Sequence, residues 1–117
     1  MSKAAKSLLV FGIYLVIAGI GFLVIPNMVL GLLGFPETSE PWIRVVGVLV
    51  VFIGYYYIRA ANNDLKPFFS WTVHARVGVM IVFSVMVVLG LADPMLIGFG
   101  LIDLLGAIWT GLALRSS

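Results

Sequence analysis

Four long apolar stretches dominate the pattern of hydrophobic and polar positions along the chain. They cover residues 8–25, 42–58, 68–91 and 94–114, and every break between them contains a charged residue. A helix that crosses a bilayer needs about 20 mostly apolar residues, because the hydrocarbon core is about 30 Å thick and an α-helix rises about 1.5 Å per residue. The pattern therefore predicts four transmembrane α-helices.

The breaks indicate where these helices end. Pro26 should end or kink the first helix, because proline lacks an amide donor and clashes with the preceding turn. Residues 26–36 are apolar but too short to span, so we expect this segment to lie flat at the membrane interface or to dip back into it. Asp93 and Pro94 predict a tight hairpin, since proline is favoured in the first turn of a helix.

Composition agrees with a membrane protein. Of the 117 residues, 62% are hydrophobic and 10% are charged, whereas a soluble domain carries about 25% charged residues. The first apolar stretch is longer than the core of a signal peptide and no Ala-x-Ala site follows it, so we expect it to be retained. The predicted fold is all-α: one domain, residues 1–117, forming a compact antiparallel four-helix membrane bundle with a short interfacial segment after the first helix.

The distribution of charge predicts the orientation. Lysine and arginine gather in cytoplasmic loops of membrane proteins. One predicted side of this protein holds Lys3, Lys6, Arg59, Lys66 and Arg115. The other side holds Glu37, Glu40 and Asp93, with Arg44 at its edge. We therefore expect a multi-pass protein of a bacterial inner membrane with both termini in the cytoplasm. The basic residues are too scattered to form a nucleic-acid surface.

Glycines at regular spacing indicate helix packing faces. Membrane helices associate by close backbone approach, so their interfaces favour small residues. The candidates are Gly12 and Gly19, Gly47 and Gly54, and, on the last helix, Gly100, Gly106 and Ala107. The three on the last helix share a face with Asp103 and Thr110. The alternative is that the 13 glycines only reflect membrane composition.

Asp103 is the most informative candidate for a binding site. It follows Pro94 by nine residues and so lies about 13 Å deep, near the midplane. A charge at that depth faces the interior and needs a partner. Arg76 and Arg44 are both within reach, and the sequence does not choose between them. The pair could be structural, or Asp103 could belong to a proton relay or ligand site. Arg44 could instead extend to the lipid headgroups.

Other chemistry is weakly represented. His74 is the single histidine and the chain has no cysteine, so we expect no metal site. An interfacial, hydrogen-bonded histidine is the simpler interpretation, although a residue that titrates near neutral pH beside Arg76 and Asp103 is the alternative. We predict no catalytic residue and no cofactor.

The order of several short motifs resembles the DoxX-like small membrane proteins of bacteria, and a neighbouring four-helix family of unknown function. The motifs are residues 19–26, 33–36, 43–47 leading to 54–57, 88–91 and 102–109. The resemblance implies an inner-membrane protein with four antiparallel helices. Some DoxX relatives are described as partners of quinone-linked oxidoreductases. No catalytic residue is carried over from this resemblance.

These observations leave three functions open. The first is a non-enzymatic protein that binds a lipid- or quinone-type ligand beside Arg44, Arg76, Asp103 and His74, or serves as an accessory subunit. The second is an oligomeric transporter or channel in which Asp103 responds to protons or ions. The third is a membrane enzyme with Asp103 or His74 as acid or base. In each case we expect a homo-oligomer or a place in a larger membrane complex.

Overall fold

Residues 1–116 of the protein form five α-helices. The computed structural model describes residues 1–116, and no strand occurs in that range. The helices are α1 (Lys3–Val24), α2 (Pro26–Leu32), α3 (Trp42–Asn62), α4 (Lys66–Val88) and α5 (Met95–Ser116). All except α2 are long and apolar enough to cross a membrane. The chain is therefore an all-α protein with the helices of a membrane protein.

Local chemistry explains the helix ends. The Ser2 hydroxyl accepts a hydrogen bond from the Ala5 amide at 3.1 Å, so α1 begins earlier than the apolar pattern alone indicates. Pro26 separates α1 from α2 and opens the shorter helix. At the start of α5, the Asp93 carboxylate accepts a hydrogen bond from the Met95 amide at 2.9 Å. Gly90, with φ of +75°, follows the end of α4, which stops at Val88 instead of the predicted residue 91.

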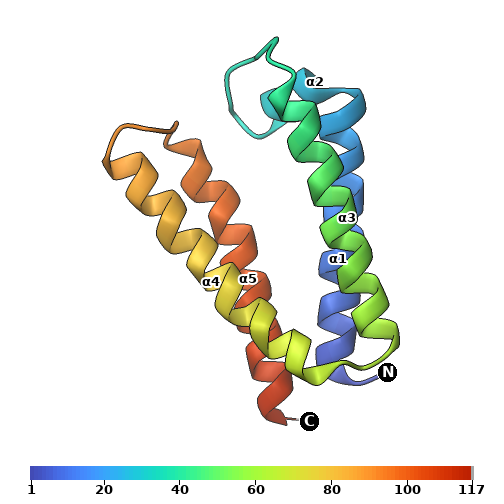
Figure 1. Cartoon of the computed structure of the whole chain (residues 1–117). Helices are drawn as coiled ribbons and strands as arrows, with labels where there is room; N and C mark the ends of the chain where they lie inside the picture. Colours follow the sequence, from blue (N-terminus) through green and yellow to red (C-terminus); the bar gives the residue numbers. More distant parts are fainter. Residues whose placement is uncertain (117) are drawn as a thin grey trace.

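The long helices form two antiparallel hairpins, α1 with α3 and α4 with α5. Figure 1 shows the hairpins meeting at the end that carries both termini and diverging towards the end where α2 lies. α1 contacts every other helix, whereas α3 makes few contacts with α4 or α5. This differs from the compact bundle that we expected, because the hairpins pack against each other over only part of their length.

Glycines set the close approach of α1 and α3. A Cβ atom on Gly47 would lie 2.6 Å from the Gly19 carbonyl oxygen, and one on Gly54 would lie 2.8 Å from the Gly12 carbonyl oxygen. The two glycine pairs thus face each other in a single antiparallel register. Backbone meets backbone at both levels, which leaves no room for a side chain.

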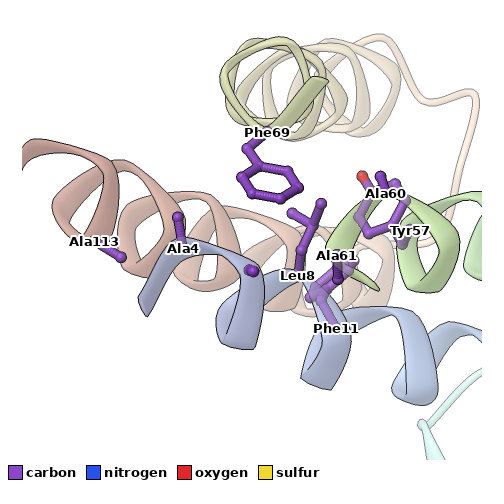
Figure 2. Close-up of a cluster of buried hydrophobic side chains, with 9 residues drawn as sticks. Ala4, Leu8, Phe11, Tyr57, Ala60, Ala61, Phe69 and Ala113 are labelled. Atoms are coloured by element: carbon purple, nitrogen blue, oxygen red, sulfur yellow. The ribbon is translucent and has the colours of Figure 1, made fainter. Parts of the chain in front are cut away.

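The hydrophobic core lies at the end with the termini (Figure 2). In Figure 2, Phe69 of α4 points towards Leu8 of α1, and both side chains are fully buried. The rest of this core is Ala4, Ala5, Phe11, Tyr57, Ala60, Ala61 and Ala113. This core joins the two hairpins at the end with the termini. At the other end the hairpins contact each other less.

Candidate functional site

Arg76 lies between the two hairpins and is only 3% exposed. Its Nε donates to the Thr72 carbonyl oxygen at 3.2 Å, and its Nη2 donates to the Thr72 hydroxyl at 3.1 Å. Thr72 precedes Arg76 by four residues on α4, so the helix itself stacks the two side chains. Nη2 also donates across the hairpin to the Thr110 hydroxyl of α5 at 2.9 Å.

The hydrogen bonds continue from Thr110 into α1. The Thr110 and Ser7 hydroxyl oxygens are 2.8 Å apart, and the Ser7 hydroxyl donates to the Ala4 carbonyl oxygen at 2.7 Å. A hydroxyl has one proton to donate. Since Ser7 uses its proton on Ala4, Thr110 must donate to Ser7 while accepting from Arg76. Each hydrogen bond is therefore donated in the same order, from Arg76 to Thr110, from Thr110 to Ser7, and from Ser7 to the Ala4 carbonyl oxygen.

Aromatic rings from the other hairpin complete the surroundings of Arg76. Its guanidinium carbon lies 4.7 Å from the centre of the Phe11 ring and 5.6 Å from that of the Tyr57 ring. Both distances fit cation–π contacts, which strengthen where water is excluded. Arg76 thus contacts residues from all four long helices, and it links the two hairpins beside the hydrophobic core.

One group of Arg76 is left without a partner. Its Nη1 is buried and makes no hydrogen bond. A Cβ atom on Gly106 would lie 2.9 Å from this nitrogen and 2.7 Å from a carbon of the Phe11 ring. Gly106 therefore makes the space into which Arg76 and Phe11 fit. A buried N–H without an acceptor is costly to the folded protein.

Asp103 lies three residues before Gly106 on α5, and with Arg76 it lines a cavity of about 400 Å³. Its side chain is half-buried and accepts no hydrogen bond from any residue that the structure describes. Arg76 and Asp103 both line this cavity, and no hydrogen bond or ion pair joins their side chains. Its remaining lining is Phe11, Tyr14, Leu15, Ala18, Val46, Val50, Ile53, Tyr57, Ala75, Val79, Phe83 and Phe99.

A second cavity, of about 310 Å³, continues the first towards α2. The two share Val46, Val50, Phe83 and Phe99, and the second is lined by apolar side chains alone. Leu30 of α2 and Phe35 of the following loop lie at its far end. Together the cavities form a groove between the hairpins, polar at its inner end and apolar along the rest of its length. We call this space the interhairpin groove.

Arg44 lies outside the interhairpin groove. It is exposed, and its Nη1 donates to the Leu23 carbonyl oxygen in the last turn of α1. Pro26 has no amide proton and α1 stops at Val24, so carbonyls of this last turn lack helical partners. Arg44 supplies a donor there and ties α1 to the start of α3. Of the two partners that the sequence left open for Asp103, Arg76 is the one that shares a cavity with it.

His74 does not join the site either. It is exposed, and it lies two residues before Arg76, on a different face of α4. In residues 1–116 no three histidine, aspartate or glutamate side chains gather in a way that could hold a metal ion.

Sequence reasoning missed several residues of the site. Thr72 could have been found from its position four residues before Arg76. Ser7, Phe11 and Tyr57 carried no such signal, because only the packing of α1 and α3 against α4 brings them to Arg76.

Comparison with known proteins returned no matching family model, curated protein or solved structure. The resemblance to DoxX-like proteins therefore stays a prediction.

Proposed function

We propose that this chain is a non-enzymatic membrane protein that holds a lipid- or quinone-type amphiphile in the interhairpin groove, with the polar group of the ligand beside Arg76 and Asp103. It would act as a binding protein or as an accessory subunit of a larger membrane complex. The helices support the membrane setting, since four of them could span a bilayer.

The observation that carries the proposal is the cavity between the hairpins, whose inner end is lined by Arg76 and Asp103 with no hydrogen bond or ion pair between their side chains. The Arg76 Nη1 has no acceptor, and the Asp103 carboxylate has no donor among the described residues. The unpaired Nη1 is buried and costs about 1–3 kcal/mol, whereas the Asp103 carboxylate is half-buried. Lipid acyl chains could fill the apolar walls but could not bond to these groups. A ligand with one compact polar group and a long apolar body would satisfy both regions.

The size and lining of the groove support the same ligand class. Small-molecule sites occupy about 300–1,000 Å³ and combine apolar walls with a few polar groups that fix orientation. The inner cavity, of about 400 Å³, has this character, and the outer one adds about 310 Å³ of apolar space. The polar groups lie at one end only, which suits a ligand that enters between the hairpins from the lipid.

The proposed orientation places the termini in the cytoplasm of a bacterial cell. Both termini lie at one end in Figure 1, where the hairpins meet. The basic residues Lys3, Lys6, Arg59, Lys66 and Arg115 belong to the termini and to the α3–α4 connection. With that end inside, the interhairpin groove would widen towards the outer leaflet. We further propose, from the sequence, that the chain assembles into a homo-oligomer or a larger membrane complex.

A substitution that fills the groove tests the proposal. Val50 lines both cavities, whereas Leu49, its neighbour on α3, is 57% exposed and lines neither of them. Native mass spectrometry of protein purified in mild detergent should find one amphiphile per chain in the wild type and in Leu49→Trp. It should find none in Val50→Trp, because the indole occupies the groove. Wild-type protein free of amphiphile, or equal retention by the two variants, would contradict the proposal.

Asp103 also keeps transport open as an alternative. A half-buried carboxylate that faces a cavity is the group expected of a proton-coupled carrier. Against it, the outer cavity is lined by apolar side chains alone, so a single chain offers ions no polar path along the groove. Proton flux into vesicles that contain the purified protein separates the two. Flux that Asp103→Asn abolishes would favour transport.

A further inference from the structure

We infer that the interhairpin groove selects an electrically neutral amphiphile whose head carries a hydroxyl group, such as a long-chain alcohol or a diacylglycerol, and rejects an anionic one. This inference rests on the proposed function and specifies the chemistry of its ligand. The balance of charge at the inner end of the groove leads to it.

The inner cavity is lined by two charged side chains of opposite sign, Arg76 and Asp103. Arginine stays protonated in proteins, and among the cavity residues Asp103 is the one carboxylate that faces it. The phenols of Tyr14 and Tyr57, which also line the cavity, are uncharged near neutral pH. The protein therefore already balances the charge of Arg76 without a ligand.

A charged headgroup would disturb this balance. An anion would bring a second negative charge beside the Asp103 carboxylate, and a cation would bring a second positive charge beside Arg76. Water is scarce in an apolar cavity at membrane depth, so such repulsion is weakly screened. A phosphate or carboxylate head is thus disfavoured, although an unpaired arginine taken alone would suggest an anion site.

The unused hydrogen-bonding capacity points to a hydroxyl among neutral heads. Asp103 accepts no hydrogen bond from the described residues, so its carboxylate calls for a donor. The phenol of Tyr14, which lines the same cavity, can in turn supply a donor to an acceptor. A hydroxyl group both donates and accepts. It can therefore bond to Asp103 through its proton and still accept a bond through its oxygen.

Photo-crosslinking with matched probes tests the inference. Three probes share one alkyl chain that carries a diazirine, and their heads are a hydroxyl, a sulfonate and a quaternary ammonium, so the charges do not change with pH. Full-length protein in phosphatidylcholine vesicles is irradiated with each probe, and labelled residues are mapped by mass spectrometry. The alcohol should label groove residues such as Val46 and Phe99 saturably, with an affinity at least about tenfold above that of either charged probe.

Two variants make the charge argument specific. Asp103→Asn leaves Arg76 without a balancing charge, so preference should pass to the sulfonate. Asp93→Asn makes the same change of charge at the start of α5, outside the groove, where asparagine can still accept the bond from Met95. Its preference should remain with the alcohol. The ranking of probes on the wild type decides the question by itself if Asp103→Asn does not fold.

The outcomes are separable. Saturable groove labelling by the sulfonate at least as strong as by the alcohol would overturn the neutral-head inference and leave the proposed binding function in place. An unchanged preference in Asp103→Asn would show that Asp103 does not set the selectivity. Absence of saturable labelling by all three probes would overturn the binding function as well.

Discussion

At the scale of single residues, the notable feature is how Arg76 is held. Thr72, Thr110, Phe11 and Tyr57 come from four different helices and all contact its guanidinium. The hydroxyls of Thr110 and Ser7 extend these hydrogen bonds to the backbone of α1. A charge in an apolar setting is stable only when such partners surround it. The same contacts link the two hairpins through Arg76, and we call this set of contacts the Arg76 joint.

Replacement of Thr110 by valine should weaken this joint. Valine keeps the shape of threonine but removes the oxygen that accepts from Arg76 and the proton that Ser7 accepts. We expect a loss of about 1–2 kcal/mol in the free energy of unfolding, measured by titration with denaturing detergent. Thr110→Ser should restore most of it. Ser84→Ala is the control, because Ser84 bonds only to Met80 within its own helix. Equal losses in Thr110→Val and Ser84→Ala would show that the joint contributes nothing.

At the scale of elements, glycine decides which helices pair closely. The α1–α3 interface has backbone-to-backbone contact at two levels, Gly12 with Gly54 and Gly19 with Gly47. The α4–α5 interface is looser, since a Cβ on Gly100 would meet the Met80 sulfur at 3.0 Å rather than a backbone atom. A flexible side chain can move away, but a backbone carbonyl cannot. The backbones of the first hairpin are therefore the more closely packed of the two.

Two glycine-to-alanine substitutions should consequently differ in their effect on stability. In Gly47→Ala the new methyl group would lie 2.6 Å from the Gly19 carbonyl oxygen, so α1 and α3 must separate. We expect about 1–3 kcal/mol of destabilisation. In Gly78→Ala, inside α4, the methyl group meets nothing within 4 Å. That change should be neutral or stabilise by up to about 1 kcal/mol, because alanine is the better helix former. Unfolding midpoints measured under one condition compare them, and no difference would contradict this account.

At the scale of the whole molecule, the two hairpins share one end and separate at the other. The core and the Arg76 joint occupy the shared end, and the interhairpin groove occupies the rest. The Ser2 hydroxyl also donates to the Asp64 carboxylate at 2.8 Å, which ties the N-terminus to the α3–α4 connection. Both termini and that connection should therefore lie on one side of the membrane.

Cysteine labelling tests this topology cleanly, because the natural sequence has no cysteine. Single cysteines at Asn63 and Ser116 should react with a membrane-impermeant maleimide only from the cytoplasmic side. Cysteines at Ser39 and Ala92 should react only from the opposite side. Vesicles that expose the cytoplasmic side and vesicles that expose the opposite side are labelled in parallel for comparison. If the cysteines at positions 63 and 39 react from the same side, fewer than four helices cross the membrane.

The sequence alone determined which segments are long and apolar enough to span a membrane, because burial in lipid requires long apolar helices whatever their arrangement. Residues 1–116 contain four such helices, and Pro26 separates the first from the short helix that follows it. Asp103 also stood out without a structure, since a charge near the midplane is conspicuous in any sequence of this type. These features depend on hydropathy and on local backbone chemistry, which are properties of neighbouring residues.

Only the tertiary structure decided what surrounds that charge. Arg44 and Arg76 were equivalent candidates by depth, and packing placed one at the end of α1 and the other in the cavity with Asp103. Packing likewise brought Ser7, Phe11 and Tyr57 to Arg76. The groove itself arises because a core joins the hairpins at one end only. Apolar residues that face lipid and those that face a neighbouring helix have the same hydropathy, so sequence cannot tell them apart.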